Sequence, residues 1–178
     1  DTRETFVGGV PAILNRISFS GELGYEIYVA PQFHLKLFEE IEANGKDLGL
    51  KLYGSRALMS LRLEKNWGVW TLDFRPDFTA LESGLDAFIN WDKNFVGKEA
   101  TLNEKKQGPN KKLVTMTVDT KNIDVTNDEA ILKDNKCVGY VTSGGYAHHV
   151  KKSMALGYVP LEFSKHETIL DIDRKSVV

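Results

Sequence analysis

RISFSGELGYEIYVA, residues 16–30, is the stretch around which the rest of this chain is organised. In both of its halves, side chains that favour a buried face alternate with polar ones, which is the two-residue period of a half-buried strand. Gly21 and Gly24 lie between the halves and can adopt the positive φ that tight turns require. The stretch therefore predicts a β-hairpin.

Glu26 is the unusual residue of this predicted hairpin. It lies between Tyr25 and Ile27 in a run of strand-forming residues, and it shares its strand face with Tyr28. A glutamate is almost never buried unless it is paired. Glu26 is therefore either solvated on an exposed sheet face or directed at a group that donates hydrogen bonds to it.

Composition places the chain among ordinary globular proteins. Of its 178 residues, 42% are hydrophobic and 27% are charged, and the net charge of -2 suggests neither a nucleic-acid nor a membrane partner. No apolar run approaches the ~20 residues that cross a bilayer. The charged opening DTRET shows no signal peptide, so we expect a cytoplasmic protein, or a mitochondrial matrix protein in a eukaryote.

Two helices are predicted after the hairpin. Pro31 opens the first, because proline is tolerated at a first helical position, and Asn44 and Gly45 mark its end. The second runs over residues 55–65 with Ser55 as its N-cap, and a strand or extended segment over residues 6–14 precedes the hairpin.

Arg62 stands out on the second helix, which is apolar over most of its circumference. At helical spacing its side chain points between Leu58 and Met59. In one interpretation the side chain follows the core to reach water. In the other, the guanidinium is held for an anion or a planar polar ligand.

An irregular aromatic stretch covers residues 66–80 and includes Trp70. It either covers the core or forms the wall of a pocket for a flat ligand. Glu82 follows as a second carboxylate near a tight turn, and residues 87–91 are predicted to form a strand.

A domain boundary is predicted where a short charged helix ends near Gln107 and Gly108 and Pro109 follow. We therefore assign residues 1–107 and 108–178 to separate domains. The second domain contains short strand-like runs separated by turn residues, which predict a small antiparallel barrel or sandwich, at residues 113–118, 130–132, 138–142, 155–159 and 168–172.

Metal binding is not expected. His148 and His149 are adjacent in a loop predicted at residues 144–152, and neighbouring side chains diverge, so they lack a third ligand at a suitable spacing. The single cysteine, Cys137, excludes an internal disulfide and a multi-cysteine metal site.

Several motifs together resemble a known family. They follow one another in the family's order over nearly the whole chain, as SFSGELGYEIYV, SLRLEKNWGVW, TALESGLDAFI, FVGKEA and VGYVTSGGYAHHVKKSMALGYVP. The chain is similar to the folate-binding aminomethyltransferases, which include the glycine-cleavage T-protein and the C-terminal half of dimethylglycine and sarcosine dehydrogenases. This resemblance implies an α+β fold. Residues 1–107 would form the later part of the folate-binding domains, and residues 108–178 the C-terminal β-barrel.

The resemblance also implies a function, the transfer of a one-carbon unit from a small amine to tetrahydrofolate. Glu26 and Arg62 fall at folate-contact positions of the family, and Trp70 falls where T-proteins usually carry tyrosine. A carboxylate can accept the ring N–H and the exocyclic amine of a pterin together. The family's catalytic aspartate belongs to an N-terminal region with no counterpart here, so we expect an incomplete enzyme, inactive alone, with that region or an FAD domain as its partner.

Two other classes of function stay open on the sequence. One is a non-enzymatic or regulatory module that keeps the fold for interaction. The other is a folate-dependent relative acting in RNA modification or iron–sulfur assembly, and the near-neutral charge argues against the RNA-binding variant.

Overall fold

The computed structural model describes residues 1–121 and 123–173. The chain divides into two compact units, Asp1–Trp67 and Gly68–Val178, and each is described by itself.

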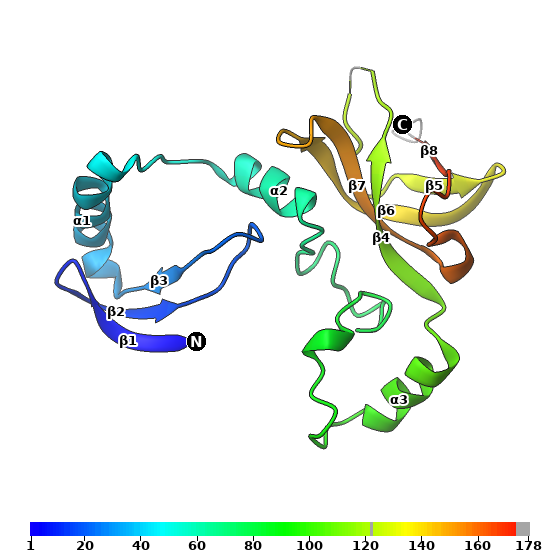
Figure 1. The fold of residues 1–178 in the computed structure, drawn as a ribbon, viewed down its shortest axis with the longest axis horizontal. Coiled ribbons are helices and arrows are strands. Elements are labelled where there is room, and N and C mark those ends of the chain that lie inside the picture. The colour runs from blue at the N-terminus through cyan, green and yellow to red at the C-terminus, as the bar shows by residue number, and fades with distance from the viewer. Residues whose placement is uncertain (122, 174–178) are drawn as a thin grey trace. The chain divides into compact units, whose positions relative to one another are not determined.

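The first unit combines a small antiparallel sheet with helices that follow it in the chain (Figure 1). The strand order is β1-β2-β3. Its elements are β1 (Thr2–Val7), β2 (Val10–Asn15), β3 (Glu26–Tyr28), the 3-10 turn η1 (Pro31–Phe33), α1 (His34–Gly45), the 3-10 turn η2 (Lys46–Leu48) and α2 (Ser55–Glu64).

The segment predicted as one strand over residues 6–14 is a hairpin instead. β1 and β2 pair in antiparallel register from Thr2 opposite Asn15 to Val7 opposite Val10. Gly8 and Gly9 form the connection with φ of 56° and 76°, which is the backbone of a type I′ turn. Two consecutive positive φ values explain why two glycines stand here.

The predicted hairpin over residues 16–30 is wrong in its pairing. β3 pairs with β2, placing Ile13 opposite Tyr28 and Asn15 opposite Glu26, and residues 16–25 form the connection. Ile17 and Phe19 remain 52% and 37% exposed. The alternation of apolar and polar residues over 16–20 therefore does not produce a buried face. Without a buried face, a short alternating run does not specify a strand.

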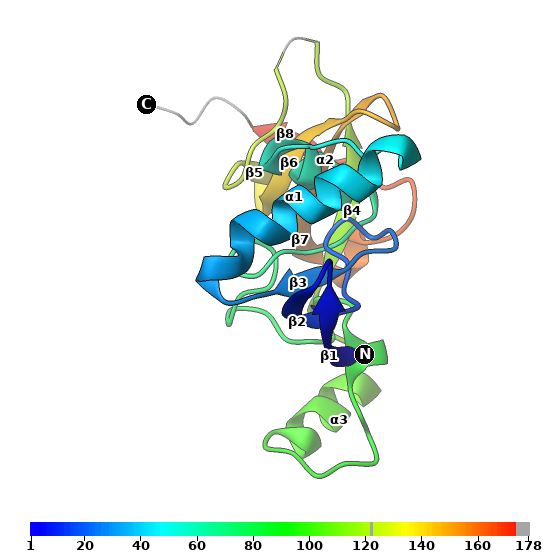
Figure 2. The same cartoon turned by 90° about the vertical axis from the view of Figure 1, so that its left-hand side faces the viewer.

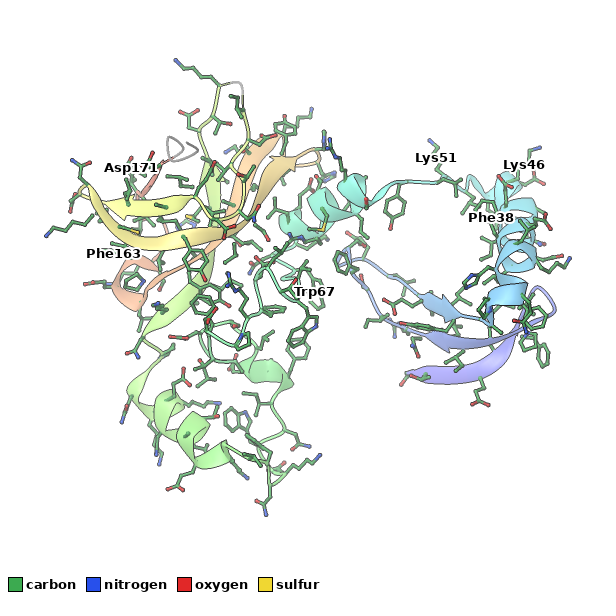
Figure 3. All side chains as sticks on the ribbon, turned by 180° about the vertical axis from the view of Figure 1, so that it is seen from behind. Phe38, Lys46, Lys51, Trp67, Phe163 and Asp171 are labelled. Atoms are coloured by element: carbon green, nitrogen blue, oxygen red, sulfur yellow. The ribbon has the colours of Figure 1, made fainter. Side chains whose placement is uncertain are left out.

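Both predicted helices of the first unit are confirmed, with a difference at each N-terminus. Pro31 opens the 3-10 turn η1, and α1 begins only at His34. Gly54, in an extended conformation, is the N-cap of α2, and Ser55 is already helical. α1 buries Leu37 and lies next to the β1–β2 turn, where Glu40 packs against Gly8 (Figures 1 and 2). Figure 3 labels two further α1-region side chains, Phe38 and Lys46.

The second unit is built on an antiparallel sheet with strand order β4-β7-β6-β5-β8. α3 lies beyond the start of β4 rather than over a face of the sheet (Figures 1 and 2). The elements are η3 (Asp86–Phe88), α3 (Lys98–Gln107), β4 (Lys111–Val118), β5 (Ala130–Lys133), β6 (Lys136–Ala147), β7 (Lys152–Pro160), η4 (Leu161–Phe163) and β8 (Asp171–Asp173).

The α+β class and the antiparallel strands after the predicted boundary are confirmed, and two local predictions are wrong. Residues 87–91 contain no strand, because Phe88 is 73% exposed within a 3-10 turn and so has no packed face. The predicted loop over 144–152 is too long: β6 and β7 pair as far as Ala147 opposite Lys152, and the turn that carries His148 and His149 covers only residues 148–151.

The core of the second unit lies between β7 and its neighbours. β7 is buried at every position from Ser153 to Val159, as expected for a central strand. The centre of this core consists of five buried aliphatic residues, Val125, Ile131, Val141, Ala155 and Val159. Phe163, labelled in Figure 3, packs against them.

A β-bulge interrupts the β6–β7 ladder. Val141 lies opposite Gly157 and Ser143 lies opposite Leu156, so Thr142 is an extra residue on β6. In a regular strand, consecutive side chains point to opposite faces. A bulge changes this direction locally, which lets Thr142 and Ser143 both reach the same neighbour.

We expect Gly139→Ala to destabilise the second unit severely. A Cβ at this position would lie 1.9 Å from the Tyr158 carbonyl oxygen, which belongs to backbone and cannot rotate away. The expected loss is about 3 kcal/mol, at the upper end for overpacking. Urea unfolding followed by circular dichroism measures it. Gly54→Ser is the control, because that Cβ meets nothing within 4 Å and serine is favoured at the N-cap position that Gly54 occupies; equal midpoints for both variants would contradict the close approach.

Candidate functional site

Glu26 lies on the open face of the three-stranded sheet. Directly opposed residues of paired strands share a face, so the register places Thr2, Asn15 and Glu26 in one row. The next row contains Glu4, Ile13 and Tyr28. Val10 and Ala12, on the other face of β2, are only 2% and 8% exposed, whereas Ile13 and Tyr28 are 42% and 54% exposed.

The Glu26 carboxylate is held by its neighbour on this face. The Tyr28 hydroxyl donates a hydrogen bond of 2.5 Å to Glu26 Oε2. This hydrogen bond, and then the negative charge of Glu26, raise the pKa of Tyr28. Tyr28 therefore stays a donor at neutral pH and orients the carboxylate, whose second oxygen, Oε1, is not used by this hydrogen bond.

Unpaired acceptors lie close to Glu26 in the sequence and in the sheet. The Oδ1 atom of Asn15, the cross-strand neighbour of Glu26, is buried and has no hydrogen-bond partner in the described part of the chain. Ser18 Oγ, in the connection to β3, is buried in the same way. Buried polar atoms without partners are uncommon and suit a site where a ligand supplies donors.

Arg62 is almost completely buried, with 2% of its surface exposed. Its guanidinium therefore does not reach solvent. This burial contradicts the interpretation in which the side chain follows the core to reach water. Nη1 lies 3.4 Å from the carbonyl oxygen of Trp67, which is labelled in Figure 3. The backbone N–H of Trp67 in turn donates to the Arg62 carbonyl over 2.9 Å, so this arginine closes the end of α2.

The end of α2 contacts the connection that leads into β3. Lys65 Nζ lies 2.6 Å from Glu22 Oε1. A Cβ on Gly21 would come within 2.6 Å of Lys65 Cγ, so only glycine allows this approach without movement. These contacts tie the segment preceding Glu26 to the helix turn that follows Arg62.

Trp70 belongs to the second unit and is 76% exposed. Its ring meets Phe74 edge to face, with centroids 5.8 Å apart and an interplanar angle of 70°. Of the three predicted contact residues, Glu26 and Arg62 therefore lie in the first unit, and Trp70 is a solvent-exposed indole of the second.

Asp73 is a buried carboxylate that the sequence analysis missed. It is fully buried, and it accepts hydrogen bonds from Thr142 Oγ1 at 2.5 Å and Ser143 Oγ at 2.9 Å. It also accepts from the backbone N–H of Val69 at 2.9 Å. The pattern Leu72-Asp73-Phe74 sets a carboxylate between apolar residues, as at Glu26, and that signal could have identified it.

Tyr158 extends this polar cluster. Its hydroxyl donates to the Asp73 carbonyl oxygen at 3.0 Å and lies 2.7 Å from Ser83 Oγ. The phenol ring stacks on Phe78 with centroids 3.5 Å apart and planes inclined by 6°. Burial is the main cause that raises the pKa of Tyr158 to about 12.

Glu82 has a structural role in the second unit. It is 8% exposed, and its carboxylate accepts hydrogen bonds from the backbone N–H groups of Thr79 and Lys111 at 3.1 and 3.2 Å. Its own N–H donates to Thr79 Oγ1, which is the reciprocal arrangement of a capping box. Glu82 therefore joins this turn to the start of β4.

Among residues 1–121 and 123–173, no group of three or more histidine, cysteine or acidic side chains is placed to hold a metal ion. His148 instead meets Tyr146 edge to face, with centroids 5.1 Å apart. Within the same ranges, every helix is too short or too polar to cross a bilayer.

We expect Tyr158 to make stability depend on pH in the alkaline range. Its folded pKa of about 12 lies above the ordinary value of 10.0, so its contribution is complete below pH 10 and is lost as the pH rises toward 12. Two pKa units correspond to at most ~3 kcal/mol. Urea unfolding at pH 8 and pH 11.5 should show a smaller stability difference between wild type and Tyr158→Phe at the higher pH; an equal difference contradicts the burial.

Comparison with known proteins agrees with this architecture. Residues 1–93 match the family model described as GCVT N-terminal domain, and residues 111–177 match the glycine cleavage T-protein C-terminal barrel domain. The aminomethyltransferase T of Bartonella henselae superposes with a TM-score of 0.83 at 24% identity, over 93% of this chain and 46% of that one. This structural likeness supports the fold.

Relatives among characterised proteins fall into two groups. Human mitochondrial dimethylglycine dehydrogenase is 36% identical over 92% of this chain and 19% of its own length. The aminomethyltransferase of Desulfitobacterium hafniense is 33% identical over 93% of this chain and 46% of its own. The chain thus spans less than half the length of either relative. Because one family model matches residues 1–93 and a second matches 111–177, this chain belongs to the glycine cleavage T-protein family.

Proposed function

We propose that this chain is part of a tetrahydrofolate-dependent one-carbon transfer enzyme, in which the open sheet face around Glu26 binds the pterin. The observation that carries the proposal is the oriented Glu26 carboxylate beside the unpaired Asn15 oxygen. Family membership supports the reaction class, because relatives include aminomethyltransferases and dimethylglycine dehydrogenases.

The chemistry of the open face fits a reduced pterin. Tyr28 engages one carboxylate oxygen of Glu26, so Oε1 and the remaining lone pairs can accept N–H groups of a ligand. Ile13, two residues from Asn15 on the same strand face, offers an exposed apolar surface for a flat ring. A carboxylate next to apolar surface makes stronger charge-assisted hydrogen bonds than one surrounded by water.

Arg62 and Trp70 have secondary roles in this proposal. The burial of Arg62 leaves it little surface for a ligand, so we assign it a weaker contact than Glu26. Trp70 lies in the second unit and is proposed separately, as an exposed aromatic face on which a flat ligand can stack. Neither side chain supplies a proton at neutral pH, because a guanidinium does not deprotonate and an indole is only a hydrogen-bond donor.

Tetrahydrofolate, when bound, supplies the nitrogen that takes up the one-carbon unit of the amine. The contribution of the open face would be binding and orientation: Glu26 fixes the pterin edge, and Tyr28 fixes Glu26. Orientation of this kind is a substantial part of catalysis in bimolecular reactions.

We expect Glu26→Gln to weaken tetrahydrofolate binding by tenfold or more. The amide keeps the shape but replaces one acceptor oxygen by a donor, and losing a charge-assisted hydrogen bond costs ~1.5–3 kcal/mol. Isothermal titration calorimetry of tetrahydrofolate measures the change, with a protein that joins this chain to the N-terminal region of its longer relatives. Glu4→Gln is a matched control, because Glu4 lies on the same face in the neighbouring row.

The outcomes separate the proposed function from its rivals. Weaker binding by the Glu26 variant, with the Glu4 variant unchanged, supports the pterin contact. Equal affinity in all three proteins would show that Glu26 is merely solvated. Absence of folate binding by the wild-type protein that includes the N-terminal region would favour the interaction module without enzymatic function.

A further inference from the structure

We propose that Asp73 is a positioning residue that holds the loop of residues 69–74 against the barrel and thereby fixes the indole of Trp70 for ligand stacking. Trp70 as a ligand contact rests on the proposed function; the fixing of the loop does not. All of the residues involved belong to the second unit.

The loop is closed on itself by backbone hydrogen bonds. The N–H groups of Asp73 and Phe74 both donate to the Val69 carbonyl, over 2.9 and 3.1 Å. The N–H of Thr71 donates to the Phe74 carbonyl over 3.2 Å, and the Val69 N–H donates to the Asp73 carboxylate. The loop is therefore a small ring of chain with Asp73 on its buried side and Trp70 on its exposed side.

The barrel is shaped to receive the Asp73 side chain. The extra residue of the β6 bulge, Thr142, and its neighbour Ser143 both direct their hydroxyls at the same carboxylate. Both hydroxyl-bearing residues are nearly inaccessible, with exposures of 2% and 3%. A regular strand would send one of these hydroxyls to the opposite face. The bulge thus directs both hydroxyls at the Asp73 carboxylate. Bulges redirect side chains in this way next to functional sites.

The backbone of the loop is strained at Thr71, and the hydrogen bonds of Asp73 oppose the release of this strain. Thr71, directly after Trp70, has φ of 72°, a conformation that is a genuine outlier for a β-branched residue. Strained residues of this kind persist only where the surrounding contacts over-determine them, and they concentrate at ligand sites. Thr71 donates its own N–H to the Phe74 carbonyl, and the buried hydrogen bonds of Asp73, two residues away, hold the loop that contains it.

These observations give a function to an otherwise costly arrangement. A buried carboxylate and a strained threonine reduce stability unless they are compensated. On the exposed side of the same loop, the Trp70 indole is 76% exposed and meets the Phe74 ring edge to face. An exposed aromatic that is already ordered loses less entropy when a flat ligand stacks on it.

The test uses the chain with Trp67→Phe and Trp91→Phe, so that Trp70 is the only tryptophan. Time-resolved fluorescence anisotropy without ligand reports the motion of its indole. Asp73→Ala should add a fast motion on the nanosecond scale and weaken tetrahydrofolate binding at least fivefold. Asp77→Asn, an exposed carboxylate nearby that pairs with Arg75, should change neither quantity.

Two further variants keep the test meaningful if Asp73→Ala folds poorly. Asp73→Asn should add no fast motion to the anisotropy decay of Trp70. Its amide oxygen can still accept hydrogen bonds from Val69 N–H and Ser143 Oγ. Thr142 Oγ1 can accept from the amide group and donate to the Leu156 carbonyl oxygen, which lies 3.3 Å from it in the wild-type structure. Thr142→Val, which removes one of the two hydroxyl donors to Asp73, should add a smaller fast motion than Asp73→Ala.

The outcomes distinguish the two proposals. If Asp73→Ala leaves the anisotropy of Trp70 unchanged, Asp73 does not position the loop. If the loop loosens but tetrahydrofolate affinity stays the same, the positioning of Trp70 has no role in binding. If the wild-type protein that includes the N-terminal region binds no tetrahydrofolate while the anisotropy of Trp70 still responds to Asp73, the proposed function fails and the anchor remains.

Discussion

The buried carboxylate of Asp73 is the interaction on which the second unit depends. It connects an irregular aromatic loop to the central pair of barrel strands through Thr142 and Ser143. The backbone carbonyl of the same residue accepts from Tyr158, whose ring stacks on Phe78 farther along the chain. One residue therefore unites loop, strand and aromatic packing. A carboxylate in this position is stabilising only because its hydrogen bonds are satisfied, which makes the cluster sensitive to the loss of any member.

In the first unit, the notable feature is a sheet with one buried and one open face. Its sheet buries one face and leaves the other open, so the side chains of alternate residues on β2 have opposite environments. The open face combines apolar surface with the Glu26–Tyr28 pair and an unsatisfied amide oxygen. Such a combination is poor for stability alone, because a polar atom without a partner is costly when buried. It is well suited to a flat ligand whose two faces are apolar and whose edge carries hydrogen-bond donors.

Much of this could be predicted from the sequence, and the failures share a physical cause. The helices, the barrel strands and the shared face of Glu26 and Tyr28 follow from periodicity, which is a local property. The partner of β3 does not, because alternation in residues 16–20 resembles a strand but has no face to bury. The position of Asp73 between Leu72 and Phe74 is a local signal of an unusual carboxylate, but its hydroxyl partners Thr142 and Ser143 lie 69 and 70 residues away, and such long-range contacts are not encoded in a local pattern. The roles of Glu26, Arg62 and Trp70 in binding stay predictions.

The shortness of β3 has a consequence for how this surface can change. Only Glu26, Ile27 and Tyr28 pair with β2, so three residue pairs determine which side chain faces outward. A shift by a single residue would turn Ile27 outward and Glu26 toward the buried side. The connection over residues 16–25 is restrained separately, because Gly21 and Glu22 both contact Lys65. Chemical identity at this surface is thus governed by strand alignment, and change in the connection beside it is compatible with the structure only away from those contacts.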